Sequence, residues 1–273
     1  MNHIIPAILG LFAILWYAAV FSLAPKVGLV KLNYKKTPIM ASYGIVSFVY
    51  MAAVMIGLAQ MHYVHMKSVW TYLAPMGAMW ALGIIDDIWG TREVGGFKGH
   101  FKRLLFERRL TTGAVKAIGG GIVGIAAGWY ISGGAPLKWV LAAILVPLAS
   151  NILNLFDLRP GRAVAVFFVG LGVICIAVGG HIADPWLVGA VVAVTLMFSV
   201  IDSKGKAMMG DSGSNTLGAA LGLIMVQSTG PVFQACAIVI IIAIHLYSEK
   251  HSMSALIERN SVLRFIDRRL GVR

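Results

Sequence analysis

Charged residues are scarce in this sequence. Asp, Glu, Lys and Arg make up 12% of its 273 residues, whereas hydrophobic residues make up 59%. Soluble domains carry about 25% charged and about 45–50% apolar residues, so this balance excludes an ordinary soluble domain. Cysteine is also rare. Cys175 and Cys236 both lie inside apolar runs, which argues against a disulfide framework or a cysteine metal site.

Long apolar runs take the place of the missing charge. A membrane-spanning helix needs about 20 mostly apolar residues to cross a hydrocarbon core of about 30 Å. The sequence therefore predicts an all-α, polytopic transmembrane helical bundle of about nine spans. We expect spans near residues 4–24, 41–60, 68–86, 114–132, 138–155, 163–180, 183–201, 213–229 and 231–248. The first run lacks a basic n-region and a cleavage site before Lys26, so we expect it to be retained.

The chain divides into an integral membrane domain, 1–248, and a basic tail, 249–273. Along the tail, apolar residues recur on one helical face and arginines lie around it, which predicts one amphipathic helix from Ser252 to Arg273 on the membrane surface. In the apolar runs, Gly120, Gly124 and Gly128 recur at four-residue spacing. This spacing predicts close packing against a neighbouring helix.

The charged residues gather in alternate loops. Of the 23 Lys and Arg residues, 21 lie on one side of the predicted bundle, and only Lys67 and Lys138 lie near loops of the other side. By the positive-inside rule the basic side is cytoplasmic, so we expect a plasma-membrane protein with its N-terminus outside and its C-terminus inside. Topology thus accounts for the net charge of +12, and we expect no nucleic-acid partner.

Acidic residues follow the same side, which the positive-inside rule does not explain. Ten of the 11 lie there, and only Asp184 is opposite. Asp86 and Asp87 end the third predicted span. A carboxylate buried at the bilayer centre costs about 2.5–3.5 kcal/mol, and a second like charge beside it adds to that cost. A divalent cation held by oxygen relieves both charges, and Mg²⁺ typically uses one or two carboxylates plus substrate phosphates.

Two further polar groups are predicted at the same face. Asn151, Asn154 and Asp157 are spaced i, i+3, i+6 at the end of the fifth span, which places them along one helix side. Asp211 and Ser212 open the eighth span between two glycines, and the amides of a helix N-terminus there suit a phosphate. We interpret these residues as the lining of a cytoplasmic cavity.

Basic residues are also concentrated between residues 92 and 116. Two anionic substrates approaching an acidic site need compensating charge, and we choose Lys98, Lys102 and Lys116 as phosphate contacts. The alternative is that this loop only satisfies the positive-inside rule and binds lipid headgroups.

Four short motifs in order resemble the polyprenyl-phosphate N-acetylhexosamine-1-phosphate transferase family, which includes the phospho-N-acetylmuramoyl-pentapeptide transferase of peptidoglycan synthesis. Thr37-Pro38-Ile39-Met40, preceded by Lys36, resembles the first cytoplasmic loop of the family, and Asp86-Asp87 its aspartate pair. The stretch from Asn151 to Asp157 resembles its Asn-Ala-x-Asn-x-x-Asp motif. Met209-Gly210-Asp211-Ser212-Gly213-Ser214 resembles its Gly-Asp-x-Gly-Ser element.

The resemblance implies a reaction and its participants. A polyprenyl phosphate attacks the β-phosphorus of a UDP-sugar, releasing UMP and leaving a lipid-linked pyrophosphoryl sugar. Such a transfer mainly requires alignment of two anions and neutralisation of developing charge. The resemblance implies Mg²⁺, with Mn²⁺ as a substitute, held by Asp211 together with Asp86 and Asp87. Asp157 joins them in the catalytic set, and Lys36 is assigned to substrate binding; a homodimer is left open.

The chain departs from the family at two places. Where many members carry a second aspartate, it has Pro160, flanked by Arg159 and Arg162, and we expect these arginines to tune selectivity for the sugar donor. The histidine-rich loop of the family is reduced to His251, which is a candidate substrate contact or an ordinary surface histidine. Two alternatives therefore stay open: a catalytically altered relative that binds carrier lipid, and a lipid or ion transporter.

Overall fold

The structure is a computed structural model that describes residues 42–90 and 112–271, the strand residues 30–32 and 38–40, and positions 15, 18–19, 22–23 and 26. This part of the chain contains ten helices and one two-stranded hairpin. The elements are β1 (Val30–Leu32), β2 (Pro38–Met40), α2 (Gly44–Gln60), α3 (Met66–Trp89), α5 (Thr112–Ser132), α6 (Pro136–Phe156), α7 (Arg162–Ala177), α8 (Pro185–Ser203), α9 (Gly210–Ser228), α10 (Pro231–Ser248), α11 (Met253–Arg259) and α12 (Ser261–Leu270).

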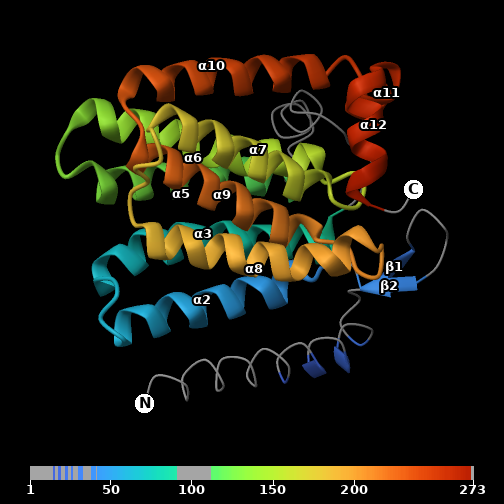
Figure 1. Ribbon diagram of the computed structural model, residues 1–273, viewed down its shortest axis with the longest axis horizontal. Helices are drawn as coiled ribbons and strands as arrows, with labels where there is room; N and C mark the ends of the chain where they lie inside the picture. The colour runs from blue at the N-terminus through green and yellow to red at the C-terminus, as the bar shows by residue number, and fades with distance from the viewer. Residues whose placement is uncertain are drawn as a thin grey trace.

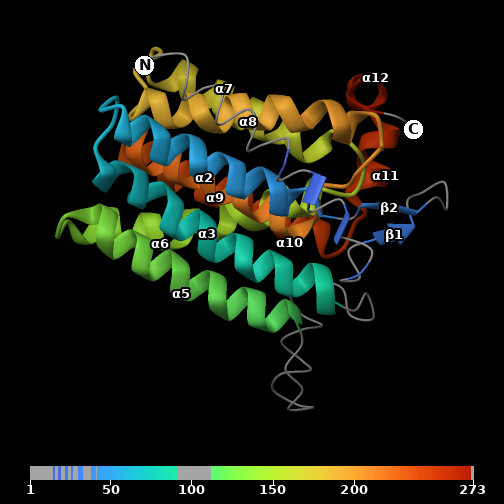
Figure 2. The same cartoon turned by 90° about the horizontal axis from the view of Figure 1, so that it is seen from below.

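The eight helices α2 to α10 lie side by side and alternate in direction (Figures 1 and 2). Each corresponds to one apolar segment predicted from the sequence, so the helical conformation of these eight segments is confirmed, while the segment at 4–24 lies outside the described residues. Proline sets the start of α6, α8 and α10, because its missing amide and fixed φ suit the first turn of a helix. The resulting fold is all-α.

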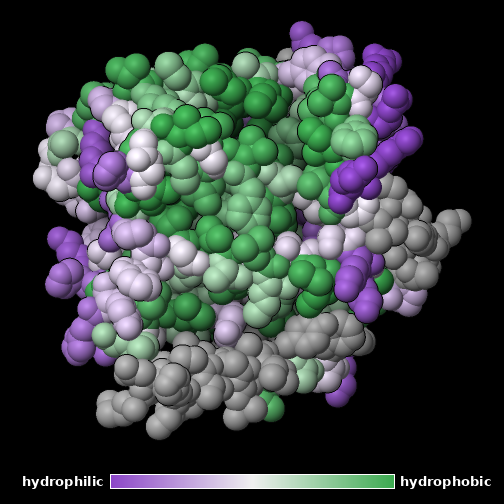
Figure 3. All heavy atoms as spheres, viewed as in Figure 1, coloured by the Kyte–Doolittle hydropathy of each residue, from purple (hydrophilic) through white to green (hydrophobic). Residues whose placement is uncertain are grey.

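Five of these helices are long and apolar enough to cross a membrane: α3, α5, α6, α8 and α10. The helices α2 and α7 are apolar but shorter, with 17 and 16 residues. Hydrophobic residues cover the middle of the face shown in Figure 3, and hydrophilic residues gather toward its two ends. The chain is thus a multi-pass membrane protein.

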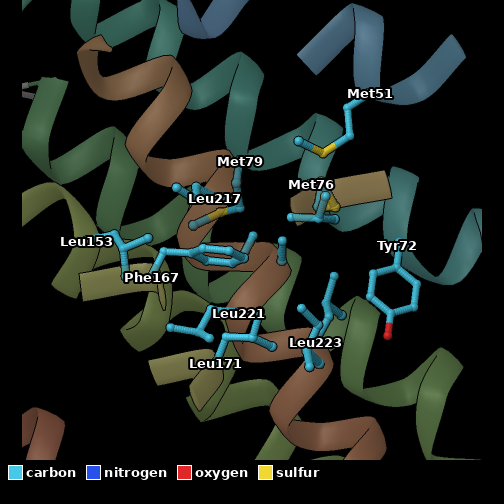
Figure 4. Packing of buried hydrophobic residues seen from close by; sticks show 14 of the residues in the cluster. Met51, Tyr72, Met76, Met79, Leu153, Phe167, Leu171, Leu217, Leu221 and Leu223 are labelled. Carbon is cyan, nitrogen blue, oxygen red and sulfur yellow. The ribbon is translucent and has the colours of Figure 1, made fainter. Parts of the chain in front are cut away.

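Helix α9 forms the centre of the bundle. Every residue from Ser212 to Val226 is buried. Leu217, Leu221 and Leu223 pack among side chains that come from the surrounding helices, including Phe167 of α7 (Figure 4). Gly218 allows α9 to pack closely against α6, since a Cβ at this position would meet the Ala149 carbonyl. A central helix shielded from lipid can carry polar residues that an exposed span cannot.

The tail differs from its prediction. The single helix expected from Ser252 to Arg273 is wrong, because the chain breaks at Asn260 into α11 and α12. The Asn260 side chain accepts hydrogen bonds from the amides of Val262 and Leu263, both at 3.0 Å, which caps α12 at its N-terminus. The two short helices lie across one end of the bundle, the right-hand end in Figure 1.

Candidate functional site

Asp211 lies where four helices converge, at the end of the bundle that α11 and α12 cross. It stands in the first turn of α9, and its Oδ2 accepts a hydrogen bond from Asn154 of α6 at 3.0 Å and forms an ion pair with Lys116 of α5. The carboxyl group of Asp86, from α3, is its hydrogen-bonded neighbour. Two carboxyl groups in contact must share a proton or a cation, so the position attracts positive charge.

Asp87 holds the start of α9. Its Oδ1 accepts from the Asp211 amide at 2.9 Å and its Oδ2 from the Ser212 amide at 3.0 Å, so both oxygens satisfy amides that a helix N-terminus leaves unpaired. The side chain is buried. This contact requires Gly83, because a Cβ at that position would meet the backbone of Asp211 and Ser212. The neighbouring aspartates of the pair therefore have different partners.

The first-loop motif reaches the same place through the backbone. Met40, the last residue of β2, forms a parallel bridge with Ala207, and the Met208 amide donates to the Met40 carbonyl at 2.8 Å. The Tyr43 and Gly44 amides then donate to the carbonyls of Met208 and Met209. All four motifs thus converge on the segment that carries Asp211. Thr37 and Lys36 lie outside the described residues.

On α6, Asn154 and Asn151 take different partners. Asn154 donates to Asp211, and its Oδ1 accepts from the Ser214 hydroxyl at 3.2 Å. Asn151 Nδ2 lies 2.7 Å from His245 Nε2 on α10. Because His245 Nδ1 is 2.8 Å from the Ile241 carbonyl, which can only accept, Nδ1 is the donor there and Nε2 is the ring nitrogen that faces the Asn151 amide.

His245 was not among the residues predicted from the sequence. The sequence already contained an indication, since His245 is the one histidine in the apolar run that forms α10, and such residues in membrane helices mark functional sites. His251, chosen instead, lies beyond α10, is exposed, and has its ring 4.6 Å from that of Tyr247.

Asp157 follows α6 and faces an acidic neighbourhood. Desolvation, and then the charges of Asp202 and Asp211, raise the pKa of Asp157 well above its usual range. Asp202, at the end of α8, is buried and accepts from the Gly161 amide at 2.5 Å. It therefore fixes the turn between α6 and α7 that begins at Asp157.

The two arginines of this turn lie against the tail. Arg162 is 3% exposed, and its guanidinium donates to both oxygens of Asp267 at 2.6 and 3.0 Å and to the Ser254 hydroxyl at 2.8 Å. Arg159 pairs at 2.7 Å with Glu258. The structure does not bring them to Asp211, and this geometry favours a positioning role for Arg162 over contact with a sugar donor.

The other predicted phosphate contacts divide into two groups. Lys116 is at the site, paired with Asp211, whereas Lys98 and Lys102 lie outside the described residues. Ser212 is fully buried, and its hydroxyl has no hydrogen-bond partner in the described part of the chain. Its backbone amide, by contrast, is used by Asp87.

The residues present fit a cation held by two carboxylates and completed by phosphate. Within residues 42–90 and 112–271, no three His, Cys, Asp or Glu side chains form a metal cluster. Asp86 and Asp211 are nevertheless in contact, and a hard ion such as Mg²⁺ commonly takes one or two carboxylates and leaves the rest of its shell to water and phosphate. Asp87 is committed to backbone amides instead.

A small cavity of about 20 Å³ lies beside the site, between α2, α8 and α9. Tyr43 and Thr195 line it, and their hydroxyls are buried without a partner among the described residues. Its size and polarity suit a single water molecule, and it is far too small for a nucleotide sugar.

No protein-family model matches the chain, and no curated protein is similar to it at a significant level. The resemblance therefore rests on the four motifs, and the structure adds that they meet at one position.

Proposed function

We propose that the protein transfers a sugar-1-phosphate from a UDP-sugar, such as a UDP-N-acetylhexosamine, to an undecaprenyl-type polyprenyl phosphate. The observation that carries this proposal is the convergence of Asp86, Asp87, Asn154 and Lys116 on Asp211 at one end of a membrane bundle. That position lets a lipid phosphate enter from the bilayer and a nucleotide enter from water. The first membrane step of a cell-envelope glycan pathway is a reaction of this kind.

The transfer exchanges one anhydride for another. An oxygen of the lipid phosphate bonds to the β-phosphorus of the UDP-sugar, the bond from that phosphorus to the bridging oxygen breaks, and UMP leaves with the electron pair. Lys116 is placed to neutralise phosphate charge, and Asn154 orients Asp211. Asp87 positions Asp211 through the backbone of α9. Asp157, with its raised pKa, is the group suited to hold a proton near the site.

Asp86 and Asp211 are the proposed Mg²⁺ ligands, and Mn²⁺ is expected to substitute. The ion, when bound, supplies Lewis-acid stabilisation of the phosphate oxygens. The chain's own contribution is to hold two carboxylates in contact beside a lysine in a partly buried setting.

A transporter is a less suitable interpretation of the same residues. Transport sites lie near the bilayer midplane between broken helices. Here Asp87 is two residues from the end of α3, Asn154 is two residues from the end of α6, and Asp211 is the second residue of α9. The polar groups are thus gathered at helix ends.

The proposed topology has nine spans with the candidate site in the cytoplasm. Support comes from the eight alternating helices and from the 21 Lys and Arg residues on the site's side. The ninth span would be the apolar run at 4–24.

The direct test combines the purified protein with undecaprenyl phosphate, a panel of UDP-sugars and Mg²⁺, and measures UMP release. We expect release with at least one donor, its loss in EDTA, and its loss in Asp211→Asn at normal protein yield. Asp184→Asn is the matched control, because Asp184 lies at the opposite end of the bundle. Lipid binding without UMP release from any donor would instead indicate a relative that only binds the carrier lipid. Undiminished turnover in EDTA would show that the reaction does not require the metal.

A further inference from the structure

Helices α11 and α12 cross the end of the bundle that carries the candidate site. They run across the long helices in Figure 1, and α12 is seen end-on in Figure 2, at the outer edge beyond α7. A helix in this orientation at the end of a membrane bundle lies in the plane of the bilayer interface.

One face of α12 is apolar and uncovered. Val262, Leu263, Phe265 and Ile266 are 63%, 42%, 60% and 47% exposed. In a helix of ten residues this is a large share of big apolar side chains that the described part of the chain leaves exposed.

Basic residues accompany this apolar face. Arg268 and Arg269 are exposed beside it, Arg264 is exposed on the polar side of the helix, and the guanidinium of Arg269 lies 4.8 Å from the centre of the Phe265 ring. An apolar face bordered by arginines complements a surface that is apolar beneath and negatively charged above. Anionic phospholipids present such a surface.

The side of α12 that carries Asp267 is fixed to the bundle, which holds the apolar face in its outward orientation. Asp267 is 5% exposed and forms the two-hydrogen-bond ion pair with Arg162. After the helix, Gly271 packs so closely that a Cβ there would lie 2.8 Å from the Pro160 carbonyl. Arg162 also donates to Ser254 of α11, which ties both helices to the same turn.

We infer that α12 is a membrane-surface anchor whose apolar face, Val262, Leu263, Phe265 and Ile266, inserts among anionic phospholipid headgroups at the edge of the bundle. The Arg162–Asp267 pair sets its orientation. This inference requires a membrane protein with the observed tail, and it does not depend on the transferase activity.

The test measures the environment of single positions in the full-length protein. Cys175 and Cys236 are replaced by Ala, a cysteine is introduced as Ile266→Cys or, as the matched control on the polar side, Arg264→Cys, and each is labelled with an environment-sensitive fluorophore. The proteins are reconstituted into nanodiscs of phosphatidylcholine with or without phosphatidylglycerol. Both positions are exposed, so neither change is expected to disturb folding.

We expect blue-shifted emission at Ile266→Cys that is quenched by lipids brominated near the glycerol, and weaker quenching at Arg264→Cys. Phosphatidylglycerol should increase the difference. Two results would overturn the inference: equal, unquenched emission at both positions, or a shift at Ile266→Cys that follows the number of protein copies per disc and not the lipid quencher. The second result would assign the face to another copy of the chain. Emission is measured on monodisperse protein, so misfolded material is removed beforehand.

Discussion

Adjacent aspartates in this protein have separate tasks. Asp86 contacts Asp211 through its side chain, while Asp87 accepts two amides from the start of α9. The sequence predicts both as members of one acidic group, because spacing shows only that they leave the membrane together. The hydrogen bonds of Asp87 depend on Gly83, because the absence of a side chain there allows α9 to lie close to α3. Such a contact between distant segments is invisible to local patterns.

Asp157 offers a test through pH. Its raised pKa means that the folded protein keeps this carboxyl neutral where the unfolded chain, with a pKa of about 3.9, ionises it. The resulting stability is fully present below about pH 4 and is lost as pH rises toward the folded pKa. Asp157→Asn keeps the neutral form at every pH.

We therefore expect Asp157→Asn to raise the melting temperature of the detergent-solubilised protein by a few degrees at about pH 8 and to change it little at about pH 4. Tryptophan fluorescence during heating measures this. UMP release should fall in the same variant if Asp157 moves a proton. An equal change in melting temperature at both pH values would show that the effect is not ionisation of this carboxyl.

Among the elements, the apolar helices follow directly from the sequence, and the break at Asn260 does not. Hydropathy is a local property, so eight predicted segments became eight helices. The break depends on a single side chain, that of Asn260, which caps α12 and so competes with continuation of the helix. Because the amphipathic pattern continues on both sides of Asn260, the pattern does not reveal the break.

The predicted close approach at Gly124 is confirmed, because a Cβ there would meet the Ala143 carbonyl and Pro147 of α6.

The two glycines of α5 at positions 121 and 124 form a matched pair. Among the described residues, a Cβ at Gly121 has nothing within 4 Å, whereas one at Gly124 lies 2.9 Å from Pro147 Cδ. Overpacking typically costs about 1–3 kcal/mol, so Gly124→Ala should lower the melting temperature while Gly121→Ala should not. Thermal unfolding of both variants in one detergent provides the comparison. If both behaved alike, the α5–α6 contact would not be close.

For the molecule as a whole, the sequence predicts which residues share an end of the bundle but not which of them touch. Arg162 and Asp267 are 105 residues apart, and Asn151 and His245 are 94 apart. No periodicity links such pairs, and charge alone offers each arginine several partners. The common end itself is predictable, because alternating helices return to the same side every second loop.

This alternation makes the proposed topology testable. Reporter fusions after Lys98, Arg159 and Lys206 should all report cytoplasm, and fusions after His65 and Ala135 should report the opposite side. The described helices place Arg159, Lys206 and the candidate site at one end, and the loops at His65 and Ala135 at the other. Because basic residues are retained on the cytoplasmic side, the end to which the sequence assigns 21 of the 23 Lys and Arg residues is the one expected to stay inside. Cytoplasmic signal from His65 or Ala135 would contradict this orientation and would remove the candidate site from contact with cytoplasmic nucleotide sugars.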